Sequence, residues 1–192
     1  KECKGECFLV VYADDFIAGF QYPWEAERFY EQLRSRMVKF GLELEENKSR
    51  IVESGRYLAS LKAKRGESTR LGTFDFLGFT FYCGRTTKGN PWIMPKTSSK
   101  KFRQKVKEIK IWLYNNKEQK LGKLMYMLNV KLVGHYRYYG ISFNSRMISN
   151  YKQQVRELLY KVLNRRSEKK SYTREGFIEM MKYYKLVNPK IY

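Results

Sequence analysis

Asp14 and Asp15 lie side by side within the segment FLVVYADDFIAGF, residues 8–20, which is otherwise mostly apolar. Adjacent carboxylates repel each other, and a buried carboxylate costs several kcal/mol unless a partner neutralises it. The pair therefore either occupies a solvated turn or binds a cation. Hard divalent cations prefer carboxylate oxygens, and two such ions can hold the attacking and leaving oxygens of a phosphoryl transfer. Glycoside hydrolysis fits less well, because it needs two carboxylates on opposite sides of a bond.

The net charge of +20 is concentrated in one part of the chain. Residues 1–84 contain 13 Lys and Arg and 13 Asp and Glu, whereas residues 85–192 contain 26 and 6, a difference of 20. Eleven of the sixteen tyrosines also fall in this basic part. Basic side chains bind phosphates and aromatic rings stack on unpaired bases, so nucleic acid is the expected partner. A well-solvated basic surface and an acidic membrane surface are the alternatives.

The few cysteines and the absence of a long apolar run limit the cellular setting. The chain has three cysteines, Cys3, Cys7 and Cys83, and one histidine, His135. So few cysteines fit a reducing compartment better than a disulfide framework, and they supply too few ligands for structural zinc. The sequence contains no run of about 18 uncharged apolar residues, which predicts that no segment spans a membrane. We therefore expect a cytoplasmic protein.

Short apolar runs flank the acidic pair. Residues 8–12 and 16–20 are too short for helices and predict two strands of a hairpin, with both aspartates at its tip. Pro23 then opens an amphipathic helix, and Gly41 ends it. The turn can direct both carboxylates to one side, as a metal site requires.

The segments that follow show weaker patterns. Residues 42–52 alternate and predict a second, half-buried hairpin, whereas residues 54–73 predict a loop with at most one helical turn. The aromatic run at residues 73–83 predicts a strand pair with Gly78 at its bend.

Residues 85–96 contain several glycine and proline breaks and predict a linker between two domains. Beyond them the apolar period becomes 3.6 residues, which predicts helices. The expected apolar faces are formed by Phe102, Val106, Ile109 and Leu113, by Leu121, Met125, Leu128 and Leu132, and by Ile148, Tyr151, Val155, Leu158 and Val162. Thr173 is expected to cap a fourth helix that runs to about Tyr184. The predicted fold class is α+β, with an antiparallel sheet and a packed helix in residues 1–84 and a basic all-α bundle in residues 97–192.

Five segments carry a family resemblance. They are YADDFI at 12–17, GLELEENKSRIV at 41–52, FDFLGFTFYCGRTTKGN at 74–90, LNVKLVGHYRYYG at 128–140 and KSYTREGF at 170–177. In this order they resemble the palm, thumb and maturase (domain X) blocks of group II intron-encoded reverse transcriptases. The resemblance implies an RNA-directed DNA polymerase that copies RNA into DNA by two-metal nucleotidyl transfer and assists intron splicing.

The resemblance also implies roles for individual residues. Asp14, Asp15 and Lys48 would be catalytic, and the two aspartates would bind two Mg²⁺ ions together with a third carboxylate expected upstream. Residues near the nucleotide and primer would be Tyr12, Ala13, Phe76, Leu77 and Gly78. Contacts with RNA would be made by Lys100, Lys101, Arg103, Lys107, His135, Arg137, Arg165 and Arg166. Two of these residues have a structural alternative, because Lys48 could be a solvated turn lysine and His135 a hydrogen-bonded packing residue.

The implied partners are an RNA template, a DNA primer and intron RNA, in the bacterial cytoplasm. The family's fingers and the remaining part of its palm are expected before Lys1, so we expect this chain alone to be inactive as a polymerase. Two positions depart from the family pattern: Val133 replaces an arginine, and Arg174 replaces a tryptophan. The alternative is therefore a maturase-like RNA-binding protein without polymerase activity, and a reverse transcriptase of phage defence or spacer capture is a weaker third possibility.

Overall fold

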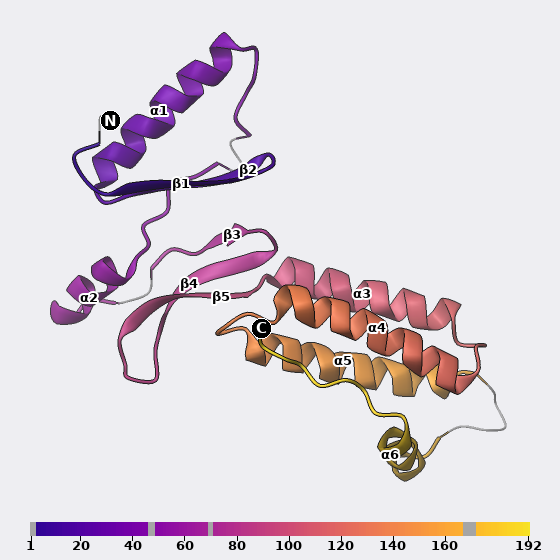
Figure 1. Ribbon diagram of the computed structural model, residues 1–192. Helices are drawn as coiled ribbons and strands as arrows, with labels where there is room; N and C mark the ends of the chain where they lie inside the picture. The colour runs from indigo at the N-terminus through magenta and orange to yellow at the C-terminus, as the bar shows by residue number, and fades with distance from the viewer. Residues whose placement is uncertain (1–2, 46–48, 69–70, 167–171) are drawn as a thin grey trace. The chain divides into compact units, whose positions relative to one another are not determined.

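The computed structural model describes residues 3–45, 49–68, 71–166 and 172–192 (Figure 1). Two small antiparallel sheets and six helices confirm the predicted α+β class. The chain divides into two compact units, which are described separately below. Unit 1 comprises residues 1–76 and 81–93, and unit 2 comprises residues 77–80 and 94–192.

The predicted first hairpin is present in unit 1. Strand β1 (Cys7–Tyr12) pairs with β2 (Asp15–Phe20), and Tyr12 lies opposite Asp15. Ala13 and Asp14 form the connection, where Ala13 has a φ of 49°. Two residues therefore suffice to reverse the chain, which places the acidic pair at the tip as the sequence predicted.

Helix α1 (Pro23–Lys39) packs against this hairpin, with the rings of Phe20 and Phe29 5.2 Å apart. Proline lies at its first position, where the missing N–H leaves no helical bond unmade. The helix also holds the start of the chain, because Oε1 of the buried Glu25 accepts hydrogen bonds from the backbone N–H groups of Lys4 at 2.5 Å and Gly5 at 3.2 Å.

Two expectations for unit 1 are wrong. The second hairpin is not formed, because the described residues 42–45 and 49–52 contain no strand. Leu42 and Ile51 are exposed, so these alternating apolar side chains do not pack on the rest of the protein. Conversely, the expected loop contains helix α2 (Arg56–Lys64), whose sequence RYLASLKAK is rich in good helix formers and buries Ala59.

The aromatic run folds as predicted, but the expected linker does not. Strands β3 (Phe74–Phe76) and β4 (Phe79–Arg85) pair, and β5 (Pro91–Thr97) extends the sheet in the order β3-β4-β5. Gly89 thus belongs to a turn, whereas Pro91 is the first residue of β5 and Pro95 lies within it. Both prolines are tolerated because β5 is an outer strand, in which a residue need not donate to the sheet.

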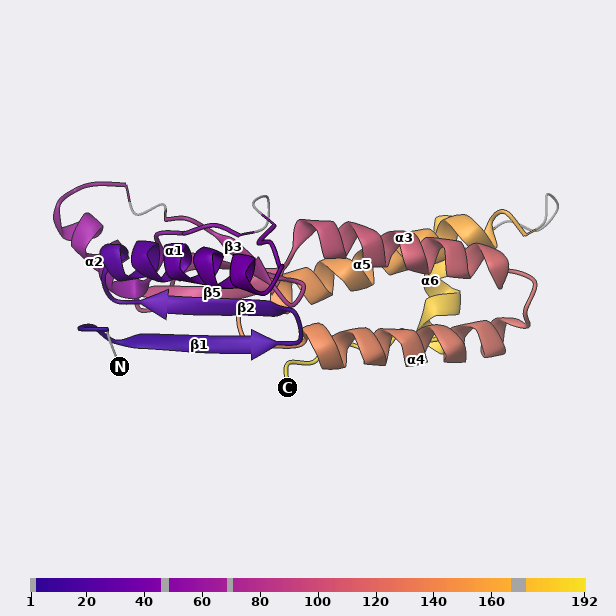
Figure 2. The same cartoon turned by 90° about the horizontal axis from the view of Figure 1, so that it is seen from above.

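Unit 2 is built on three long helices that lie alongside one another (Figures 1 and 2). They are α3 (Ser99–Asn115), α4 (Leu121–Tyr139) and α5 (Ser145–Leu163), followed by the short α6 (Arg174–Tyr183). Most of the predicted apolar positions contribute to the core. Leu159 and Leu124 are fully buried, whereas the predicted Leu158 and Leu121 are only half-buried. Within the described ranges, no helix combines the length and apolarity that crossing a bilayer requires.

Local capping residues set the helix boundaries in unit 2. The Thr173 hydroxyl accepts a hydrogen bond from the N–H of Gly176 at 3.1 Å, which confirms the predicted cap of α6. Ser98 caps α3 in the same way by accepting from the N–H of Lys101. Each cap satisfies a donor that the first helical turn leaves unpaired.

Asn144 joins three elements of unit 2 in the buried interior. Its Oδ1 accepts from the N–H of Thr97 at 2.8 Å, and its Nδ2 donates to Oγ1 of Thr97 at 2.9 Å and to the carbonyl of Tyr139 at 2.8 Å. The side chain is completely buried and precedes α5. One carboxamide thus fixes the start of α3, the end of α4 and the start of α5.

We expect Asn144→Ala to lower the free energy of unfolding by about 2–4 kcal/mol. The change removes the side-chain acceptor of the buried Thr97 N–H and one of the two donors to the Tyr139 carbonyl, which keeps the N–H of Ile141. A buried donor that loses its acceptor carries a large desolvation penalty. Urea unfolding followed by circular dichroism measures the difference. Asn150→Ala, at an exposed position of α5, is the control and should leave stability unchanged or slightly higher. Equal stabilities of the two variants would contradict the role assigned to Asn144.

Candidate nucleic-acid interface

The acidic pair faces solvent in unit 1. Asp14 lies in the turn, Asp15 is the first residue of β2, and both side chains are exposed. Two carboxylates provide only part of the oxygen shell that Mg²⁺ prefers. In the described part of the chain, no cluster of three or more His, Cys, Asp or Glu residues could hold a metal ion. Asp14 and Asp15 would by themselves supply only part of the oxygen ligands of such an ion.

Strand β1 beside this pair is uncovered. Phe8, Leu9, Val10, Val11 and Tyr12 are all between 47% and 63% exposed, although they alternate between the two faces of the strand. A two-stranded sheet that leaves so much apolar surface in water is only marginally stable. Both faces of β1 therefore present apolar side chains to solvent. Lys48, the third predicted catalytic residue, lies outside the described residues.

The predicted primer-side turn belongs to unit 2. Leu77 and Gly78 have φ values of 49° and 79°, as the two-residue connection of β3 and β4 requires. The Gly78 carbonyl accepts from the N–H of Ser98 at 2.9 Å, and the Leu77 carbonyl accepts from the Tyr138 hydroxyl at 2.9 Å. A Cβ on Gly78 would lie 3.5 Å from Cγ of Lys101. The fold thus brings this turn next to the basic start of α3, whereas Phe76 ends β3 in unit 1.

Exposed cations crowd the first half of α3. Lys100, Lys101, Arg103 and Lys107 are all exposed, and Nε of Arg103 donates to the carbonyl of Ser99 at 3.2 Å. The first turn of α3 contains no acidic residue. Cations at a helix N-terminus are unfavourable by a few tenths of a kcal/mol to about 1 kcal/mol each, because the helix dipole is positive there. An anion bound at this end would remove that repulsion.

A second basic cluster lies farther along the same helix pair. Lys110 of α3, Lys161 of α5 and Arg165 surround a cavity of about 210 Å³, to which no described carboxylate contributes. The Arg165 guanidinium donates to the Tyr114 hydroxyl, which also lines the cavity. We call these four residues the basic hollow. Only Arg165 was predicted from the sequence. Lys110 and Tyr114 form one pair four residues apart and Lys161 and Arg165 another, and only the packing of α3 on α5 brings the two pairs together.

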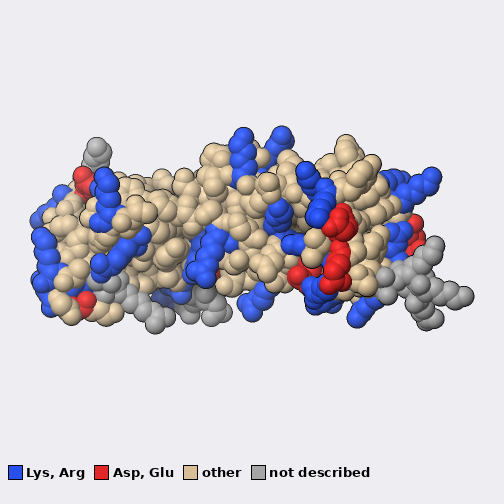
Figure 3. All heavy atoms as spheres, turned by 90° about the horizontal axis from the view of Figure 1, so that it is seen from below, with Lys and Arg blue, Asp and Glu red and all other residues tan. Residues whose placement is uncertain are grey.

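Arg166, the next predicted contact, has a structural role. Its Nη2 donates to the carbonyl of Gln119 at 2.9 Å, and the residue is half-buried. The Arg166 guanidinium therefore supplies a hydrogen-bond donor to a backbone carbonyl in the loop between α3 and α4. Lys and Arg side chains elsewhere are spread over the face shown in Figure 3, where Asp and Glu are confined to a few places.

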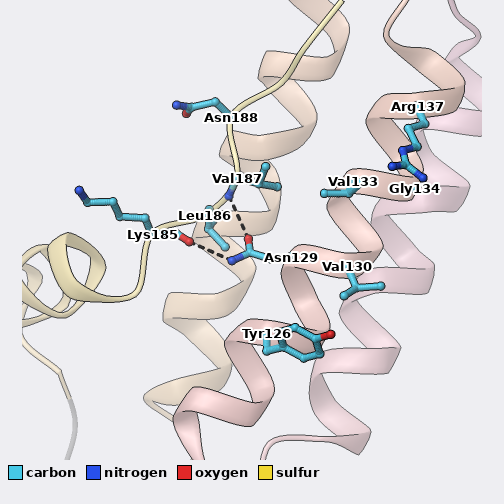
Figure 4. A pocket seen from close by; sticks show the side chains of 10 residues that line it. All are labelled: Tyr126, Asn129, Val130, Val133, Gly134, Arg137, Lys185, Leu186, Val187 and Asn188. Atoms are coloured by element: carbon cyan, nitrogen blue, oxygen red, sulfur yellow. Dashed lines mark hydrogen bonds between the residues drawn. The ribbon is translucent and has the colours of Figure 1, made fainter. Parts of the chain in front are cut away.

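Arg137 lies at one end of a groove beside α4. The groove encloses about 620 Å³ between α4 and residues 185–188 (Figure 4). Tyr126, Val130 and Val133 lie along its helical wall, and in the figure they form a row with Arg137. Sequence analysis noted Val133 only as a departure from the family pattern and missed Tyr126. The spacing of these four residues would have shown that they share a helix face, but not that a groove lies there.

The other departure, Arg174, retains a ring contact. Its Nη1 lies 3.5 Å from Oε2 of Glu157, and its Cζ lies 4.7 Å from the centre of the Tyr160 ring. A guanidinium stacks on an aromatic face much as an indole does. Arg174 therefore connects the start of α6 with α5 through Glu157 and Tyr160.

His135 is buried among aromatic rings, which favours a packing role over a contact with RNA. Its ring is only 8% exposed and stacks on Tyr151 with centroids 3.7 Å apart. Burial, with a smaller contribution from the charge of Lys105, lowers the pKa of His135 to about 4. The imidazole is therefore neutral at physiological pH and lies away from the surface that RNA could reach.

This lowered pKa predicts a pH-dependent stability. The unfolded chain takes up a proton near pH 6.5 and the folded chain only near pH 4, so the contribution of His135 is complete above pH 6.5 and declines as the pH falls towards 4. We expect protonation of His135 in the unfolded chain to lower the free energy of unfolding by about 2 kcal/mol between pH 7 and pH 5. His135→Phe retains an aromatic ring without a titrating group and should show a smaller loss in urea unfolding. Identical pH profiles would refute the assignment.

Comparison with known proteins adds an independent observation. Residues 99–184, a little under half of the chain, match the family described as the group II intron, maturase-specific domain. No curated protein and no solved structure matches the chain. The matched segment contains α3 to α6 and therefore the basic hollow and the α4 wall of the groove. The match supports a group II intron maturase role for this segment.

Proposed function

We propose that this chain binds group II intron RNA through the helices of unit 2 as the maturase portion of a reverse transcriptase. The supporting observation is the basic hollow, where Lys110, Lys161 and Arg165 converge without a lining carboxylate. Three cations so close together repel one another unless an anion joins them. Backbone phosphates supply such anions, and RNA duplexes are recognised mainly by their shape and backbone.

The hollow and the start of α3 would act together on one RNA. Both lie on α3, whose N-terminal lysines are exposed and whose middle contributes Lys110 to the hollow. Helices α3 and α5 pack closely, and Leu113 and Val155 are fully buried in the core. The cations are therefore presented by a rigid frame, and less side-chain freedom is lost on binding.

We further propose that unit 1 supplies part of an RNA-directed DNA polymerase site. The supporting observation is the exposed pair of Asp14 and Asp15 beside the uncovered strand β1. Fingers and a further palm segment would cover β1 and bring the third carboxylate. Asp14 and Asp15 would then hold two Mg²⁺ ions, which lower the barrier to nucleotidyl transfer by stabilising the charge on phosphate oxygens. Lys48 would lie near the nucleotide phosphates, and the turn at Gly78 near the primer.

Removing two cations of the basic hollow tests the RNA-binding proposal. We expect Lys161→Ala with Arg165→Gln to weaken binding of intron RNA and to reduce the slope of log Kobs against log[salt] by about 1.5, since each phosphate contact contributes about 0.7–0.9. Filter binding across a salt series measures both. The control Lys117→Ala with Lys182→Ala removes the same charge from lysines that already pair with Glu118 and Glu179. Equal effects of the two double variants would show that only net charge matters.

Asp14→Asn tests the polymerase proposal in a protein that joins this chain to its fingers. The amide cannot replace a carboxylate as a ligand of Mg²⁺ in the transition state, so primer extension should fall by about 100-fold or more while RNA affinity stays the same. Glu31→Gln removes an equal charge from an exposed position of α1 and should be fully active. Normal extension by the Asp14 variant would exclude the metal site and leave the RNA-binding role intact.

A further inference from the structure

The groove beside α4 is a preformed site with an apolar helical wall. Tyr126, Val130, Val133 and Arg137 are spaced by four, three and four residues, so they share one helix face. Figure 4 shows them in one row, with residues 185–188 running beside it. Arg137 lies eleven positions after Tyr126, so the row extends for about 16 Å at 1.5 Å per residue.

Hydrogen bonds hold the second wall in place. Nδ2 of Asn129 donates to the carbonyl of Lys185 at 2.9 Å, and its Oδ1 accepts from the N–H of Val187 at 2.9 Å (Figure 4). Leu186 between them is buried. The Asn129 carboxamide therefore holds residues 185–187 beside α4. A ligand that enters the groove does not have to order this segment.

Two side chains of the helical wall, Tyr126 and Val130, remain open to solvent. Tyr126 is 71% exposed and Val130 is 54% exposed, whereas Leu124, Leu128 and Leu132 on the core face of α4 are fully buried. A Cβ placed on Gly134 would meet no other atom within 4 Å. An aromatic ring and aliphatic side chains thus line an accessible cavity whose volume suits a ligand of moderate size.

The charge of the groove identifies the type of ligand. Arg137 and Lys185 are the charged lining residues, and no described carboxylate lines the cavity. Within the described residues, the Arg137 guanidinium has no hydrogen-bond or ion-pair partner, and in Figure 4 it reaches towards the row. The ligand should therefore combine flat apolar faces with negative charge. Unpaired nucleotides have both properties, whereas a duplex hides its base faces and would leave the apolar wall uncovered.

We propose that the groove between α4 and residues 185–188 binds a short unpaired segment of RNA, with a base stacked on Tyr126 and a backbone phosphate on Arg137. The inference rests on the proposed RNA-binding function and adds a distinct single-strand site to the phosphate contacts of the basic hollow. The row of apolar side chains packs against the bases, and Arg137 binds one phosphate.

Tyr126→Ala in the full chain separates this site from general RNA binding. We measure the affinity for a single-stranded oligouridine and for a blunt RNA duplex of equal length at one salt concentration. Tyr126→Ala should weaken single-strand binding about ten-fold and leave duplex binding and the salt slope unchanged, because it removes stacking and no phosphate contact. Tyr126→Phe should bind like the wild type. Tyr183→Ala, at another exposed tyrosine that does not line the groove, is the control.

Arg137→Gln provides a second readout, since it should lower the salt slope for the single strand by about one and not for the duplex. Equal losses on both RNAs would overturn the inference by showing that this face binds the duplex backbone. Unchanged single-strand affinity in Tyr126→Ala would also overturn it and would point to a protein ligand for the groove. If the wild type binds neither RNA, the proposed function itself fails. That outcome can be told apart from the two above, because in both of those the wild type binds RNA.

Discussion

The buried carboxamide of Asn144 constrains the architecture of unit 2 more than any other single polar group. Its three hydrogen bonds tie Thr97, before α3, to Tyr139, at the end of α4, while Asn144 itself begins α5. A buried amide keeps one arrangement only when all its partners are present, because every lost bond leaves a desolvated group unpaired. The apolar core supplies most of the stabilisation, and Asn144 determines how the helix ends meet.

This node lies at the end of the bundle where the predicted primer-side turn is also held. Ser98 follows Thr97 and donates its N–H to Gly78, and Tyr138 precedes Tyr139 and donates its hydroxyl to Leu77. Backbone neighbours of the Asn144 network thus position the turn beside Lys101. The coupling explains how a conformationally demanding turn keeps its geometry next to a cluster of cations.

The cations of unit 2 divide into those used by the fold and those left for a ligand. Arg166 and Arg174 are committed to the Gln119 carbonyl and to Glu157. Lysines of the hollow and Arg137 of the groove have no carboxylate at their sites among the described residues. Cations that form no ion pair within their own chain attract a polyanion more strongly. The maturase-specific match over residues 99–184 agrees with an RNA as that polyanion.

The sequence by itself determined the local features. The hairpin at Asp14 and Asp15, the turn at Gly78 and the Thr173 cap follow from residue types within a few positions, because short-range backbone preferences and hydrogen bonds decide them. Only the tertiary structure decided that His135 is buried, that Tyr126 and Arg137 face residues 185–188, and that Lys110 meets Lys161 and Arg165. These contacts join residues far apart in the chain. They depend on how helices pack, which no local pattern encodes.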